Sequence, residues 1–126
     1  MGRQITRSSE SLLRKLAIGH GPLLERVLCP QSAMAMAAEQ GLDDRTIALA
    51  RIAVLVALDA EPASYLRECN EAMASGATSD EIVGVLIAVA SLTGSVRLVA
   101  AAPRTALGLG HDVEAALEDP DRRDGD

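Results

Sequence analysis

The segment from Thr46 to Leu58 most constrains how this chain can fold, because it is almost entirely apolar and carries one charge, that of Arg51. A helix with so few polar residues has no face suited to water and must be buried nearly all round. The apolar run is also far shorter than the ~20 residues that a helix needs to span a bilayer. We therefore predict a buried helix over residues 44–58 with other helices packed around it.

The core around this helix must be built from small side chains. The chain has 126 residues, no Phe or Trp, and Tyr65 as its one aromatic residue. This length suits one domain, which we expect over residues 1–110. Ala, Leu, Val, Ile and Met must then fill the core, which implies closely packed helices. A lone domain of this size covers several apolar helices with difficulty, so we expect a homo-oligomer.

Charge is unevenly distributed along the chain. The formal net charge is −6, and residues 111–126 carry seven acidic residues and two arginines. We expect this segment to be an acidic, disordered tail. The remainder is almost neutral and has no basic stripe or aromatic platform, which argues against a nucleic-acid partner. The first ten residues lead into no apolar run of signal-peptide length, so we expect a cytoplasmic protein that has no membrane partner.

Helix start and stop signals recur along the chain, whereas the alternating pattern of strands is absent. Thr78, followed three residues later by Glu81, has the form of a capping box, in which each side chain satisfies the backbone N–H of the other residue. Gly76 is suited to end the preceding helix, and Pro103 should kink or divide the last one. We predict an all-α bundle of about six helices, with helical segments over residues 9–18, 22–28, 32–40, 44–58, 62–75, 78–92 and 96–107.

The order of these signals resembles that of the carboxymuconolactone decarboxylase and alkylhydroperoxidase D superfamily. The resemblance is strongest over residues 42–108 and implies an alkylhydroperoxidase D-like, all-helical subunit that assembles with copies of itself, as a dimer or, as we expect here, a trimer or hexamer. It rests on Leu42-Asp43-Asp44-Arg45 at a helix start, on Gly76-Ala77-Thr78 with Asp80-Glu81-Ile82, and on Thr93-Gly94 before the last helix.

Superfamily members that carry out peroxide or disulfide chemistry place a Cys-x-x-Cys-x-x-x-His motif at the start of the middle helix. In this chain Glu61 and Ser64 stand at the two cysteine positions, and Glu68 stands at the histidine position. The thiol route needs paired cysteines, so we do not expect peroxidase or disulfide reductase activity. Decarboxylase-like members lack the cysteine pair and usually keep a histidine near the position of Glu68. A carboxylate can take over acid or base work there if burial raises its pKa.

Four polar residues of the middle helix form the candidate catalytic site. Glu61, Ser64, Tyr65 and Glu68 have i, i+3, i+4 and i+7 spacing, so they could line one cleft. In this interpretation Glu68 is the acid or base, and Tyr65 and Ser64 donate hydrogen bonds to the substrate. In the alternative interpretation Glu61 caps the helix and the other residues form its solvated face.

Two arginines are candidates for binding the negative charge of a substrate. Arg51 interrupts an apolar helix, where a guanidinium is costly unless it meets a carboxylate or a ligand anion. The alternative for Arg51 is a structural salt bridge to Glu68 or Glu71. Arg97 follows the Thr93-Gly94-Ser95 break, and its alternative is an ordinary surface charge.

The cysteines and histidines give weaker signals. His20 and His111 have no partner at metal-ligand spacing, so we expect neither a metal nor a cofactor. Cys69 lies on the apolar stripe of the middle helix, where a free cysteine behaves as a small hydrophobic residue. Cys29 precedes Pro30 at a helix end. A redox pair between Cys29 and Cys69 remains an alternative.

Two functions are therefore compatible with the sequence. The first is a cofactor-independent lyase or isomerase that acts on a small acidic or carbonyl-bearing molecule, with Glu68 as the acid or base and Arg51 or Arg97 as the anion anchor. The second is a non-catalytic, oligomeric binding or assembly module that has lost the active-site residues of the family. The two differ in whether the stripe from Glu61 to Glu68 lines a closed pocket.

Overall fold

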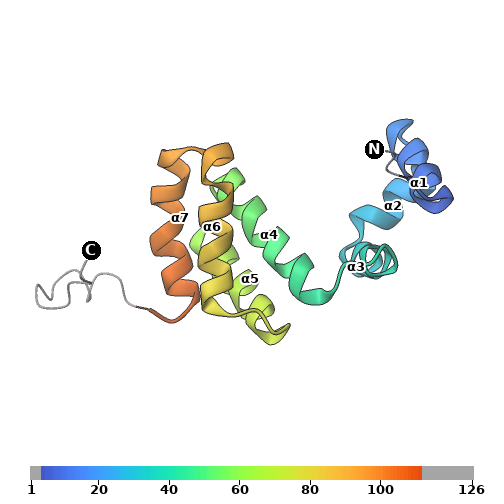
Figure 1. Ribbon diagram of the computed structural model, residues 1–126. Helices are drawn as coiled ribbons and strands as arrows, with labels where there is room; N and C mark the ends of the chain where they lie inside the picture. The colour runs from blue at the N-terminus through green and yellow to red at the C-terminus, as the bar shows by residue number, and fades with distance from the viewer. Residues whose placement is uncertain (1–3, 112–126) are drawn as a thin grey trace, which may run out of the picture. The chain divides into compact units, whose positions relative to one another are not determined.

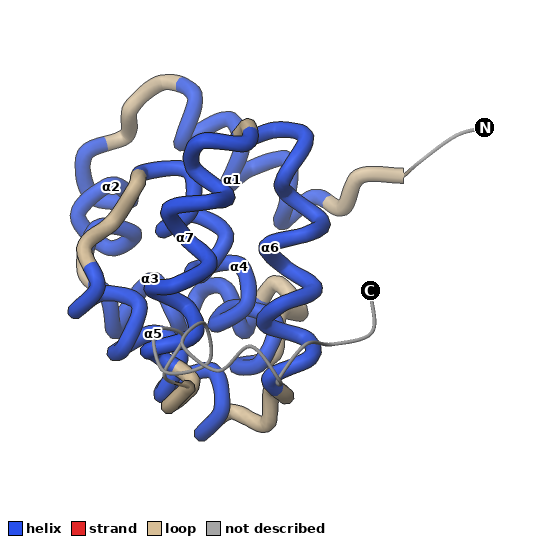
Figure 2. The backbone as a smooth tube through the Cα atoms, turned by 90° about the vertical axis from the view of Figure 1, so that its left-hand side faces the viewer, coloured by secondary structure: helices blue, strands red, loops and turns tan. Residues whose placement is uncertain are grey.

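The computed structural model describes residues 4–111. Within this range every regular element is a helix and strands are absent (Figure 2), which confirms the predicted all-α fold. Seven helices form in these residues, one for each of the seven predicted segments, and Cys29 is extended between the two short helices that flank it. The proline that follows disfavours a helical conformation at Cys29.

No helix of the described range is long and apolar enough to cross a membrane. The predicted acidic tail, apart from His111, lies outside the described residues.

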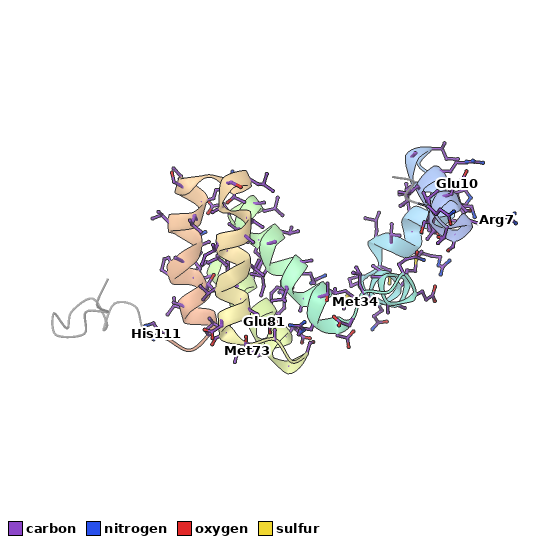
Figure 3. All side chains as sticks on the ribbon, in the orientation of Figure 1. Arg7, Glu10, Met34, Met73, Glu81 and His111 are labelled. Carbon is purple, nitrogen blue, oxygen red and sulfur yellow. The ribbon has the colours of Figure 1, made fainter. Side chains whose placement is uncertain are left out.

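The chain divides into two compact units, the N-terminal unit (residues 1–43) and the C-terminal unit (residues 44–126). Whether these units form one domain over residues 1–110 stays a prediction. The N-terminal unit contains three short helices: α1 (Arg7–Ala17), α2 (Gly21–Leu28) and α3 (Pro30–Glu39). Figure 3 labels Arg7 and Glu10 on α1 and Met34 on α3.

Side-chain caps fix where the first two helices begin. The hydroxyl of Thr6 accepts a hydrogen bond from the N–H of Ser9 at 3.0 Å, and Nδ1 of His20 accepts one from the N–H of Leu23 at 3.3 Å. Such caps satisfy N–H groups that have no partner inside a helix. His20 thus has a structural role. Leu23 is the one buried side chain among the described residues of the N-terminal unit, so this unit has little core of its own.

The C-terminal unit contains four helices, which Figure 1 shows as a bundle: α4 (Asp44–Leu58), α5 (Pro62–Ala74), α6 (Ser79–Thr93) and α7 (Ser95–Gly108). Helix α5 packs against α4 on one side and α7 on the other, and α6 also packs against both α4 and α7. The sequence order α4–α5–α6–α7 therefore differs from the order around the bundle, in which α5 and α6 lie on opposite sides. This arrangement brings α4 and α5 together along the candidate site.

Small and medium aliphatic side chains fill the core, as the composition requires. Ile52 and Val56 of α4, Ile82 of α6 and Ala101 of α7 are buried in one cluster with Tyr65. Deep burial of one face of α4 confirms part of the prediction for this helix. Its opposite face is different, since Val54 and Leu58 are exposed in the described chain. The helix was predicted to be covered nearly all round, so its exposed apolar face needs another explanation.

The junction between α5 and α6 follows the capping signals of the sequence. The hydroxyl of Thr78 accepts a hydrogen bond from the N–H of Glu81 at 3.0 Å, and Oε1 of Glu81 accepts one from the N–H of Thr78 at 2.9 Å. Both halves of the predicted capping box are therefore present. The other carboxylate oxygen of Glu81 pairs with Arg45 of α4. Figure 3 labels Glu81 at this end of the bundle, with Met73.

Helix α7 continues through Pro103 as one helix, so the division that the sequence offered as one outcome does not occur. A proline removes one backbone hydrogen bond from a helix interior and crowds the preceding turn. Buried contacts on either side keep the helix together, because Ala101 and Thr105 both lie in the core. The hydroxyl of Thr105 donates a hydrogen bond to the carbonyl of Ala101 at 2.8 Å. Tertiary packing thus outweighs the local effect of the proline.

Two glycines in helices offer a direct test of the packing between α5 and α7. A Cβ atom on Gly108 would lie 2.9 Å from Sγ of Cys69 and 3.1 Å from the carbonyl oxygen of Tyr65, whereas one on Gly84 would meet nothing within 4 Å. We expect Gly108→Ala to lower the free energy of unfolding by about 1–3 kcal/mol, because the helices must separate. Gly84→Ala should raise it by about 0.5–1 kcal/mol. Urea unfolding followed by circular dichroism measures both, and equal effects of the two substitutions would contradict the close packing.

Candidate functional site

The candidate site contains an ion pair between the two helices that the bundle places side by side. Arg51 projects from α4, and its Nε and Nη2 atoms donate hydrogen bonds to Oε2 and Oε1 of Glu68 on α5, at 3.0 Å and 2.9 Å. Such a two-bond pairing matches the planar guanidinium to both carboxylate oxygens. The side chain of Arg51 is 50% exposed and that of Glu68 is 6% exposed. Glu68 is therefore the carboxylate that neutralises the positive charge of Arg51 on the apolar helix α4.

The ion pair determines the protonation state of Glu68. Hydrogen bonding from Arg51 lowers the pKa of Glu68, and this effect exceeds the opposing effect of burial. Nε of Arg67 lies 3.7 Å from Oε1 and lowers the pKa further. In return, Glu68 raises the pKa of Arg51. The carboxylate is thus held ionised at neutral pH and is poorly suited to donate a proton, although the sequence suggested that burial could raise its pKa.

The other residues of the predicted stripe lie at different depths. Tyr65 is fully buried in the core, and its hydroxyl has no hydrogen-bond partner in the described chain. Burial raises the pKa of Tyr65. Ser64 is half-buried, whereas Glu61 is exposed beside the start of α5 and its side chain makes no capping hydrogen bond. The spacing of these four residues places them on one side of the helix, but their side chains differ in burial and do not meet in one polar cleft.

Arg97 lies at another location, beside the break between α6 and α7. Its side chain borders two hollows in the surface of the C-terminal unit, with volumes of about 570 Å³ and 310 Å³. Neither hollow is lined by Glu68 or Arg51. The structure therefore brings Arg51 and Glu68 together and places Arg97 in a different setting, with Asp59 as the acidic residue nearby.

A second ion pair, which the sequence analysis did not identify, holds the turn between α4 and α5. Asp59 follows the last residue of α4 and has a positive φ of 52°, a conformation that Asp tolerates better than most residues. Nη1 of Arg104 on α7 donates hydrogen bonds to Oδ1 of Asp59 at 2.7 Å and to the carbonyl oxygen of Ala60 at 2.9 Å. Helix α7 thus fixes the turn that leads into the candidate site.

The two cysteines are free and occupy contrasting environments. Cys29 is exposed in the N-terminal unit, and the backbone N–H of Ser32 lowers its pKa. Cys69 is buried in the C-terminal unit, and burial raises its pKa. His, Cys, Asp and Glu side chains form no group of three or more able to hold a metal ion within residues 4–111. Three ion pairs of this unit, Arg45–Glu81, Arg51–Glu68 and Asp59–Arg104, each join two different segments of the bundle.

Comparison with known proteins identifies the family. The family model described as "Carboxymuconolactone decarboxylase family" matches residues 29–106, which is more than half of the chain. The chain therefore belongs to the carboxymuconolactone decarboxylase family, and the predicted resemblance is confirmed. The match begins within the N-terminal unit and continues through most of α7. Comparisons with curated proteins and with solved structures find no match.

The lowered pKa of Glu68 predicts how stability depends on pH. Because the pKa of Glu68 in the folded protein is below 4.5, the unfolded chain takes up its proton at a higher pH than the folded protein does. The contribution of the ion pair is therefore complete above about pH 4.5 and is lost as the pH falls through the folded-state value. Glu68→Gln should lower the free energy of unfolding at pH 7 by about 1–3 kcal/mol and weaken its dependence on pH below 4.5.

Urea unfolding at a series of pH values measures this difference. Glu61→Gln provides the matched control, because Glu61 is exposed at the start of the same helix. The control should have the same free energy of unfolding as the unmodified protein at each pH. If Glu68→Gln and Glu61→Gln had the same stability at every pH, the ion pair would make no net contribution to folding.

Proposed function

We propose that this family member is a homo-oligomeric assembly module and carries out no acid–base chemistry at residues 61–68. The observation that carries the proposal is the two-bond pairing of Arg51 with Glu68, which satisfies both charged groups of the site. The position at which decarboxylase-like relatives usually keep a histidine is taken by a carboxylate that is already paired. A substrate would have to displace Arg51 to reach Glu68, and an unpaired buried charge is costly.

Exposed apolar side chains on two neighbouring helices support self-association. Val96 and Val99 of α7 are 83% and 72% exposed, and Ile87 of α6 is 70% exposed. Val83 and Leu107 extend these rows. Helical spacing places Arg97 and Arg104 of α7 to one side of the row that Val96, Val99 and Leu107 form along the same helix. Large exposed apolar side chains in rows along two helices that pack together are typical of protein–protein contacts. We define Val83, Ile87, Val96, Val99 and Leu107 as the α6–α7 face and propose that it contacts a second copy of the chain.

Sedimentation velocity tests the proposal on the purified protein. We expect a trimer or hexamer, and we expect Ile87→Glu and Val99→Glu to shift the population toward monomer, because each buries a charge in the contact. Leu66→Glu is the matched control, since Leu66 is about half exposed on α5, outside the α6–α7 face. Circular dichroism verifies that each variant stays folded. A monomeric unmodified protein would overturn the proposal, as would dissociation by Leu66→Glu alone.

A second function is favoured by one observation. Glu68 is the one buried acidic side chain within residues 4–111, and it is held as the ionised base. The half-exposed guanidinium of Arg51 retains N–H groups that could hold a small acidic or carbonyl-bearing molecule, and Ser64 lies on the same side of α5. In that case the protein would be a cofactor-independent lyase or isomerase in which Glu68 removes a proton.

Turnover assays on small lactones and carboxylic acids separate the two functions. The assembly module is expected to give no turnover that depends on Glu68. Activity in the unmodified protein that falls at least about a hundredfold in Glu68→Gln, a loss typical of a general base, would establish the enzyme instead. Glu25→Gln, at an exposed position of α2 in the N-terminal unit, serves as the control and should leave any such activity unchanged.

A further inference from the structure

The two hollows of the C-terminal unit share Thr93 and Arg97 and therefore adjoin at the junction of α6 and α7. One hollow runs between α4 and α6, and the other lies over the start of α7. We call the two together the α4–α6 groove. The groove includes neither the Glu68–Arg51 pair nor any residue of the α6–α7 face apart from Val96. Its lining is Ala53, Val54, Ala57, Val89, Leu92 and Thr93, with Gly94, Ser95, Val96, Arg97, Ala100 and Asp59 at the other end.

The part of the groove between α4 and α6 is apolar. Its volume is about 310 Å³, at the lower end of the range of roughly 300–1,000 Å³ that is typical of small-molecule sites. Aliphatic side chains such as Val54, Val89 and Leu92 form its walls, and no aromatic ring is present on which a planar ligand could stack. This composition fits a flexible hydrocarbon chain.

The part of the groove over the start of α7 carries a positive charge that nothing in the described chain neutralises. Arg97 is exposed and forms no ion pair within residues 4–111. Asp59 is the one acidic residue of the lining, and Arg104 already binds its carboxylate at 2.7 Å. The first turn of α7 also lacks a side-chain cap, so its N–H groups remain available to an acceptor. This end of the groove is complementary to one small anion.

We propose that the α4–α6 groove binds a linear aliphatic monocarboxylate, with the carboxylate at Arg97 and the hydrocarbon chain between α4 and α6. One guanidinium matches a single carboxylate, and the aliphatic walls remove the chain from water. The proposal is independent of self-association through the α6–α7 face. It also gives a role to the exposed apolar side of α4, because Val54 and Ala57 would contact the ligand.

Nuclear magnetic resonance titration of the ¹⁵N-labelled full chain with sodium octanoate and sodium decanoate tests the proposal. Amide signals of residues 53–57 and 93–97 should shift in a saturable way. Decanoate should bind more tightly than octanoate, by about two- to fourfold for each methylene that leaves water. Decanol lacks the charge and acetate lacks the chain, so both should bind at least tenfold more weakly than decanoate.

Two matched pairs of variants locate the ligand. Arg97→Gln should weaken decanoate binding about tenfold and leave decanol unchanged, whereas Arg26→Gln, an exposed arginine of α2, should change neither. Ala57→Phe fills the apolar part and should weaken both ligands, whereas Ala63→Phe on α5 should not. All four positions are exposed or at the groove surface, so the variants should keep the helical circular dichroism spectrum.

Two results would overturn the proposal. Equal decanoate affinity in Arg97→Gln and the unmodified protein would show that the arginine does not bind the carboxylate. Dissociation of an oligomer by decanol and decanoate alike, measured by sedimentation velocity, would show that the groove is covered by a second copy of the chain and not by a small molecule.

Discussion

The close approach of α5 and α7 is the constraint on which the C-terminal unit depends. A chain with one aromatic residue cannot fill a wide space between helices, so the helices must lie near one another. Gly108 permits this contact, because the backbone of α7 there lies directly against Cys69 and the carbonyl of Tyr65. Tyr65 is fully buried in the core of this unit. Its buried hydroxyl has no hydrogen-bond partner within residues 4–111, which is costly, and the large apolar ring offsets that cost.

Much of the fold could be predicted because its signals are local. The capping box of Thr78 and Glu81, the positive φ of Gly76 and the proline at the start of α5 depend on neighbouring residues alone. The continuity of α7 through Pro103 could not be predicted in the same way. It depends on how Ala101 and Thr105 pack against other helices, which a pattern along one segment does not contain. Local rules therefore placed the helices, and tertiary packing decided how one of them continues.

The candidate site was predictable only in part, for a physical reason. A charge in an apolar helix requires a partner, so the sequence indicated a carboxylate for Arg51 and narrowed the choice to two residues. Helical spacing then placed Glu61, Tyr65 and Glu68 on one side of α5. Helical spacing does not indicate how deeply each side chain is buried, however. These three side chains range from exposed to fully buried. The Asp59–Arg104 pair was missed because Asp59 lies in a turn and Arg104 in a helix far along the chain, and neither interrupts an apolar segment in a way that requires a partner.

The Asp59–Arg104 ion pair at the turn after α4 has a consequence for the order in which the chain folds during translation. The two partners of the Asp59–Arg104 pair are 45 positions apart in the chain, so the turn is synthesised well before the residue that holds it. During translation α4 and α5 can form and pair through Arg51 and Glu68, whereas the contacts that α7 makes with both helices and with the turn form only after α7 has left the ribosome. The bundle therefore reaches its final geometry late, since contacts between distant residues form only after the intervening chain is available. A ribosome stalled before Arg104 would carry this turn with its local backbone hydrogen bonds but without the Asp59–Arg104 pair.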